Sequence, residues 1–416
     1  MALDSDVADF ALLGTGVAPL VAATHLLAQG KSVLILNPDW DFFREDSELP
    51  LDPLWPVSSR NVTPQRLARN SPEHALQQLR PDFPGAIELW SGPETGGAGY
   101  RDAYAPHVRQ RARLWISSGE LARARGWETM EDMYVETSDA GLNPQLLEGP
   151  IAAKRFPGIG RQEGTDDLRG LLLPKLSDVD VNRYRNGLLE FVRERLGPKR
   201  VICAATQVEP IAEGVRFHSG GAPRTARLNE GMLVFWTPRL SQWVLTQAQT
   251  HGKKSETPLV NPTGVRLWEE WMLNSREPLD PGIVGVFEGM TAWAELEGAP
   301  DPRVERLFRL AVLRAGPLVP LSGLNVPQSG MTWASAESFA SLSRLSHGFL
   351  GWERFSISSM RPRAVLEWKD AIPHDSAVCW AFSRGSIQVK VVSGCDGPIV
   401  DVVRTARLAC GQGEIL

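Results

Sequence analysis

The chain has 416 residues, of which 43% are hydrophobic and 22% charged, a composition that is typical of globular proteins and excludes extended disorder. Its net charge is −5, so it lacks the basic footprint of nucleic-acid-binding proteins and of polybasic membrane patches. The four cysteines form no CxxC pair and stand at no metal-ligand spacing from a histidine. We therefore expect no metal site and no disulfide framework.

The N-terminal residues carry acids and no basic segment, which argues against a signal peptide and favours a cytoplasmic protein. The apolar stretch from residue 10 to 27 is interrupted by two glycines and a proline. We therefore expect no membrane span there and interpret the stretch differently.

The opening residues predict a strand, a glycine turn, a helix and a second strand. Residues 9–13 are apolar, residues 17–29 are rich in Ala and Leu and end at Gly30, and residues 32–36 are apolar and β-branched. This is a βαβ unit within about thirty residues, as expected of an α/β protein.

Later segments continue the alternation of strands and helices. The spacing of apolar residues predicts helices at 109–125, 178–196, 307–314 and 399–408, and strands at 133–137, 201–205, 208–211, 214–218, 231–236, 376–382 and 387–392.

The first turn carries the strongest chemical motif, Gly14-Thr15-Gly16-Val17-Ala18-Pro19. Glycines between a buried strand and a helix let the backbone approach a pyrophosphate, and the free N–H groups of the helix N-terminus favour that anion. Pro19 costs little in a first helical turn, because the N–H that it lacks would have no intrahelical acceptor.

The ribose contact of such a unit falls at the end of the second strand, about 20 residues after the glycines. Asn37, Pro38 and Asp39 occupy that place. Asn37 can accept a hydroxyl hydrogen bond without bringing charge, and Asp39 offers a carboxylate.

This layout resembles the glutathione-reductase-type FAD flavoproteins, in the branch of D-amino-acid oxidase, glycine oxidase and sarcosine oxidase. The resemblance implies FAD as cofactor and a return to the FAD domain at VDVNRYRNGLLEFVRERLG and VICAATQVEPI, where Val208 would pass the adenine. It also implies a small residue pair where Trp236 and Thr237 stand.

Two further segments carry the resemblance. Ser359-Met360-Arg361-Pro362 is similar to the family's Leu-Arg-Pro motif, whose arginine grips a substrate carboxylate, so Arg361 is the candidate catalytic residue. The turn before the last helix resembles the flavin-edge turn, and its candidate contacts are Gly394, Asp396, Gly397 and Ile399.

The expected fold is therefore α/β. A Rossmann-like FAD-binding domain with a three-layer sheet would comprise 1–60, 165–245 and 375–416. An α+β substrate or cap domain built on an antiparallel sheet would comprise 61–164 and 246–374.

Three functions stay open. The first is an FAD-dependent oxidoreductase that oxidises a small-molecule amine or amino acid, with hydride transfer to flavin N5. The second is a flavin-dependent monooxygenase, or a flavoprotein that modifies a protein or peptide substrate, for example in quinone-cofactor maturation. The third is a non-catalytic flavoprotein-like subunit.

Overall fold

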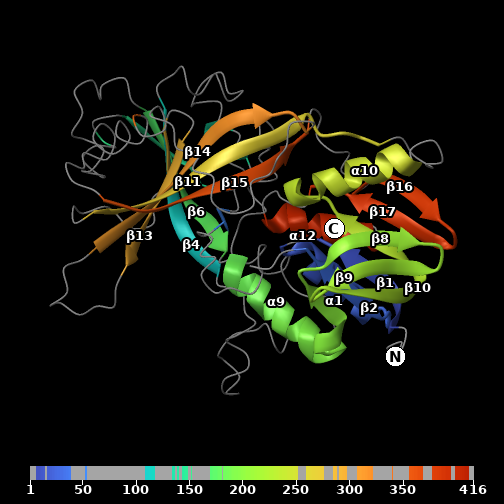
Figure 1. The fold of residues 1–416 in the computed structure, drawn as a ribbon. Coiled ribbons are helices and arrows are strands. Elements are labelled where there is room, and N and C mark those ends of the chain that lie inside the picture. The colour runs from blue at the N-terminus through green and yellow to red at the C-terminus, as the bar shows by residue number, and fades with distance from the viewer. Residues whose placement is uncertain are drawn as a thin grey trace, which may run out of the picture.

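The structure, a computed structural model, describes residues 6–14, 16–38, 52–53, 108–117, 134–135, 138–139, 143–148, 151, 169–179, 181–251, 259–275, 284–287, 290–297, 307–321, 340, 356–368, 377–394 and 399–411. Within these ranges the strands form three sheets, of eight, five and four strands. Figure 1 shows the eight-stranded sheet on one side of the view and the other two sheets on the opposite side. The fold is mixed α/β, as predicted.

The eight-stranded sheet is mostly parallel. Along its main path the strand order is β16-β17-β10-β1-β2-β7, and β9 joins the early part of β10 and pairs with β8. Neighbouring strands from β17 to β7 run parallel. The strands are β1 (Asp6–Leu13), β2 (Val33–Asn37), β7 (Val201–Cys203), β8 (Thr206–Ile211), β9 (Gly214–Ser219), β10 (Ala222–Phe235), β16 (Val378–Arg384) and β17 (Ile387–Val392).

Helices cover one face of this sheet. They are α1 (Ala18–Ala28), α9 (Val181–Leu196) and α12 (Ile399–Ala409), and their apolar side chains share one buried cluster with side chains of β1, β2 and β10. In α9 the buried positions Leu188, Leu189 and Val192 follow the three- and four-residue spacing of an amphipathic helix.

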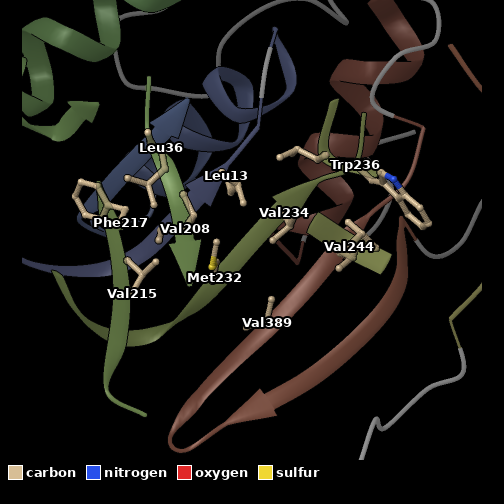
Figure 2. Close-up of a cluster of buried hydrophobic side chains, with 14 of the residues drawn as sticks. Leu13, Leu36, Val208, Val215, Phe217, Met232, Val234, Trp236, Val244 and Val389 are labelled. Carbon is tan, nitrogen blue, oxygen red and sulfur yellow. The ribbon is translucent and has the colours of Figure 1, made fainter. Parts of the chain in front are cut away.

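The second face carries the β8–β9 hairpin and α10 (Ser241–His251), which follows the short helix η5 (Pro238–Leu240). Figure 2 shows this second core, in which Leu36, Leu13, Val234 and Val389 of the sheet lie among side chains of the hairpin and of α10. The result is three layers: helices, sheet, and hairpin with α10. The predicted three-layer arrangement is confirmed.

The other two sheets are antiparallel. The five-stranded sheet has the order β12-β13-β14-β11-β15, and the four-stranded sheet pairs β6 with β3, β4 and β5. Their strands are β11 (Gly264–Ser275), β12 (Val284–Phe287), β13 (Met290–Glu297), β14 (Leu307–Val319), β15 (Ser356–Glu367), β3 (Asp52–Pro53), β4 (Val108–Ser117), β5 (Gln145–Glu148) and β6 (Arg169–Val179). β6 leads directly into α9, and the short helix η4 (Pro198–Arg200) then leads into β7.

Three sequence-based element predictions are wrong. The predicted helix at 109–125 is strand β4 over residues 108–117, and the predicted helix at 307–314 is strand β14. β14 pairs with β11 on one side and β13 on the other, and this pairing outweighs the helix propensity of its Leu and Ala residues. The predicted strand at 133–137 is helical at residues 134 and 135.

Candidate functional site at the carboxyl edge of the parallel sheet

Four of the predicted contact segments lie along one edge of the eight-stranded sheet. Because β17, β10, β1, β2 and β7 run parallel, the segments that follow them begin at their shared carboxyl edge. The chain runs from β1 outward to β2 and β7, whereas β10 has β17 and β16 on its other side. The strand order therefore reverses between β1 and β10, and ligands of open α/β sheets bind outside such a point.

The two glycines of the first turn have different structural roles. The Gly14 N–H donates to the Leu36 carbonyl (3.2 Å), and a Cβ at Gly14 would lie 2.9 Å from the Cβ of Phe235 in β10. Gly16 has φ +81°, and a Cβ there would have no described heavy atom within 4 Å. Gly14 thus lets the turn pack against β10, whereas Gly16 leaves backbone open at the sheet edge.

The N-terminus of α1 has no cap among the described residues. Val17 is the N-cap residue, without a side-chain hydrogen bond, and the first turn contains no acidic residue. The Val17 carbonyl accepts from the N–H groups of Leu20 and Val21, both at 3.0 Å. The N–H groups of Val17 and Ala18 lie before the first intrahelical donor, and Pro19 has no N–H group. This helix end therefore suits an anionic group.

The predicted ribose residues lie at the end of β2. Asn37 is 1% exposed, its backbone pairs with Cys203 of β7, and its carbonyl accepts from the Ala205 N–H at 2.9 Å. Pro38 is partly exposed, and Asp39 lies outside the described residues. The structure therefore brings Asn37 to the same edge as Gly16, with its side chain below the surface.

The segment from β7 to β8 has an unusual backbone. Ala204 (φ 53°) and Gln207 (φ 49°) adopt left-handed conformations that non-glycine residues rarely take, and the β8–β9 pairing is irregular between Thr206 and Glu209. Val208 is 7% exposed, and its carbonyl accepts from the Trp243 indole N–H of α10 at 2.6 Å. Sequence reasoning missed Trp243, because no residue pattern marks its hydrogen bond to Val208.

The C-terminal turn begins where β17 ends. Gly394 has φ +72°, and the N–H and Oγ of the preceding Ser393 donate to the Ala377 carbonyl at 3.0 and 3.3 Å. Asp396 and Gly397 lie outside the described residues, and the backbone of Ile399 opens α12.

Arg361 lies in the other part of the molecule, on β15 at the edge of the five-stranded sheet. Its register partner in the neighbouring strand β11 is Glu270. The backbone of β15 then continues to Leu366, which is 4% exposed and packs into the core of the eight-stranded sheet. One strand thus links the Arg361 position to the part of the molecule that carries the glycine turn.

Trp236 occupies the position where a small residue was expected. It is fully buried, its backbone N–H donates to the Val392 carbonyl (2.8 Å), and its indole N–H donates to Ser241 Oγ (3.1 Å). It is therefore a core residue at the carboxyl ends of β10 and β17.

Three further observations on the described part of the chain concern thiol reactivity, metal binding and membrane insertion. Burial raises the pKa of the Cys379 and Cys410 thiols to about 12, so both stay protonated and unreactive at neutral pH. The described residues contain no group of His, Cys, Asp and Glu that could hold a metal ion. They also contain no helix that is long and apolar enough to span a membrane.

No protein-family model and no curated protein sequence matches the chain. Solved structures do match. The amino acid oxidase NikD has a TM-score of 0.64 at 14% identity, over 99% of this chain and 96% of that chain. The glycine oxidase from Geobacillus kaustophilus has a TM-score of 0.61 at 14% identity, over 97% and 94%.

L-alpha-glycerophosphate oxidase from Mycoplasma pneumoniae, solved with FAD bound, has a TM-score of 0.60 at 11% identity, over 97% of this chain and 94% of that chain. These similarities extend over nearly the whole chain. They show that the chain has the fold of these oxidases.

Proposed function

We propose that the protein is an FAD-dependent oxidoreductase that oxidises an amine or amino-acid-like substrate. In this proposal the segments 1–60, 165–245 and 375–416 hold the cofactor, and the segments 61–164 and 246–374 cover the substrate. The observation that carries it is the open, left-handed Gly16 beside the uncapped N-terminus of α1, at the point where the strand order of the described sheet reverses.

The residues present at that edge fit a dinucleotide. A Cβ at Gly16 would meet no described heavy atom within 4 Å, so a diphosphate would lie against this turn and accept from the N–H groups of Val17 and Ala18. Asn37, Pro38 and Asp39 would lie toward the adenosine ribose, and Val208 toward the adenine. Gly394, Asp396, Gly397 and Ile399 would lie at the flavin edge. The backbone N–H groups of these flavin-edge residues would also stabilise negative charge on the flavin.

FAD, when bound, supplies the hydride acceptor at flavin N5. The chain itself would bind and orient the substrate. Arg361 would hold a substrate carboxylate through the planar fork of its guanidinium and so fix the carbon that loses the hydride. The similar solved structures support this substrate class, since an amino acid oxidase and a glycine oxidase are among them.

The first test is the absorbance spectrum of the purified full chain. We expect a yellow protein with flavin bands, which bleach anaerobically when a panel of amino acids and amines is added. Bleaching by reduced nicotinamide alone would instead favour the monooxygenase. A chain that stays colourless after incubation with FAD and binds no ADP would contradict the proposal.

The second test is Arg361→Ala in the flavin-loaded protein. A charge-paired carboxylate that loses its partner costs about 2–5 kcal/mol, so we expect KM for the best substrate of that panel to rise roughly 30-fold or more. Arg384→Ala is the matched control, because Arg384 is exposed at the end of β16. Equal KM values in the two variants would contradict a carboxylate clamp at Arg361.

A further inference from the structure

Two tryptophans meet where the five-stranded sheet joins the eight-stranded sheet. Trp236 follows β10 directly, and its backbone N–H bonds to Val392, the last residue of β17. Trp368 follows β15, and its ring stands edge-on to that of Trp236, with centroids 5.4 Å apart and an interplanar angle of 88°. Trp368 therefore lies beside the carboxyl edge at which we place the cofactor.

The junction around this pair is well fixed. Val265 of β11 and Leu366 of β15 are buried in the core of the eight-stranded sheet, and Val319 of β14 packs against it. The backbone N–H and Oγ1 of Thr263 both donate to the Glu367 carbonyl, at 2.7 and 2.8 Å. Trp368 thus follows directly on a residue whose backbone carbonyl accepts two hydrogen bonds, and its ring packs against the same core.

The two indole N–H groups differ in one respect. Trp236 Nε1 donates to Ser241 Oγ, as a buried indole usually does. Trp368 Nε1 is also buried from solvent, yet it has no hydrogen-bond acceptor within the described part of the chain. Buried donors without an acceptor are rare and destabilising, and an indole N–H can only donate. An acceptor from outside the chain would remove this cost.

We propose that Trp368 Nε1 is a ligand-binding donor, which takes an sp² oxygen of a molecule bound between the two sheets. This inference rests on the proposed function, which supplies two sources of such an oxygen. One is a pyrimidine carbonyl of the flavin, and the other is the carboxylate of the substrate. With either ligand, the hydrogen bond from Trp368 depends on how the five-stranded and eight-stranded sheets dock against each other.

The stability test compares Trp368→Phe with Trp236→Phe in the protein without cofactor. Both variants keep an aromatic ring and lose an indole N–H. Trp236→Phe loses a hydrogen bond and leaves Ser241 with one fewer donor, so its Tm should fall. Trp368→Phe removes a donor that has no acceptor among the described residues, so its Tm should fall much less or rise. An equal fall in both variants would overturn the proposal, because it would mean that Trp368 Nε1 is already paired.

The binding test follows the indole N–H signal of Trp368 by NMR in protein labelled with ¹⁵N-tryptophan, the signal being assigned by its loss in Trp368→Phe. A shift with FAD but not with ADP would assign the flavin as the acceptor. A shift only when acetate is added to the FAD-loaded protein would assign the substrate carboxylate. For the assigned ligand, Trp368→Phe should raise Kd about fivefold to tenfold, as expected for one hydrogen bond.

The two proposals fail in different ways. If FAD binds and the Trp368 signal moves with none of FAD, ADP or acetate, this inference is wrong and the proposed function stands. If FAD does not bind, the proposed function is wrong, and acetate alone decides whether Trp368 donates to an oxygen ligand. A signal that acetate leaves unmoved in that case would overturn the inference as well.

Discussion

Gly14 and Gly16 are two residues apart in one motif, yet the structure requires glycine at each for a different reason. At Gly14 the limiting contact is with Phe235 of the neighbouring strand β10. At Gly16 the limit is the left-handed backbone, and the space around it is open with respect to the described residues. The first glycine therefore belongs to the packing of the sheet, and the second belongs to the candidate site.

This difference predicts opposite outcomes for two substitutions. Gly14→Ala places a Cβ against Phe235, so it should lower the stability of the protein by about 1–3 kcal/mol. Gly16→Asn should nearly keep Tm, because Asn tolerates the left-handed region, but its side chain would occupy the open turn. We expect its Kd for ADP, measured by calorimetry, to rise at least about tenfold. Normal ADP affinity in Gly16→Asn would place the diphosphate elsewhere.

At the scale of elements, the segment from β7 to β8 stores conformational strain. Two non-glycine residues, Ala204 and Gln207, adopt left-handed conformations, and each costs about 1–2 kcal/mol. Such strain persists only where surrounding contacts hold it. Here the Ala205 N–H bonds to the end of β2, and the Trp243 indole holds the Val208 carbonyl from α10.

Trp243→Phe should release this segment. It keeps a ring against the core but loses the bond to the Val208 carbonyl, so we expect a loss of about 1–2 kcal/mol in unfolding free energy. Backbone amides at 205–209 should also exchange faster in hydrogen-exchange mass spectrometry. Thr246→Ala is the control, since Thr246 is exposed on the next turn of α10. Unchanged exchange at 205–209 would show that β8 is held without Trp243.

At the scale of the whole molecule, the sequence predicts those elements whose local pattern agrees with their environment. The βαβ unit is such a case, because residues 10–13 and 33–36 of its strands are apolar and two glycines occupy the turn between the first strand and the helix. The hairpin of β8 and β9, the helix α9 and the final helix α12 were predicted for the same reason. In each of them the spacing of the apolar residues fits only one kind of element, a strand or a helix.

Two of the three failures fall in the antiparallel sheets. In β4, Arg109, Arg111 and Arg113 alternate with other residues in a two-residue period that indicates a strand, but the leucine spacing suggested a helix. In β14 the decisive information is its pairing with β13 on one side and with β11 on the other, which the residue pattern within 307–319 does not contain. The contact between Trp236 and Trp368 was unpredictable for the same reason, since only the docking of two sheets brings them together.

Asp9 joins three segments of the eight-stranded sheet near the amino ends of its strands, so it bears on the stability of the whole molecule. Its carboxylate accepts from Asn229 Nδ2 (2.9 Å) in β10 and from the N–H (2.7 Å) and Oγ (2.9 Å) of Ser32, just before β2. These hydrogen bonds, that from Asn229 first, lower the pKa of Asp9 below its ordinary value. A lowered pKa in the folded state means that the carboxylate stabilises the fold above about pH 4, and that this contribution is lost as the pH falls through the folded-state pKa.

Asp9→Asn should therefore unfold more easily at pH 7, by about 1 kcal/mol, because an amide accepts these bonds less well and adds donors that face donors. The difference from the unmodified chain should shrink when urea titrations are repeated at successively lower pH below about 4, where Asp9 itself becomes protonated. Glu213→Gln, at the exposed turn between β8 and β9, is the matched carboxylate control and should not reproduce this pH profile. A stability difference that stays constant from pH 7 to pH 3 would mean that the Asp9 charge does not hold β1, β2 and β10 together.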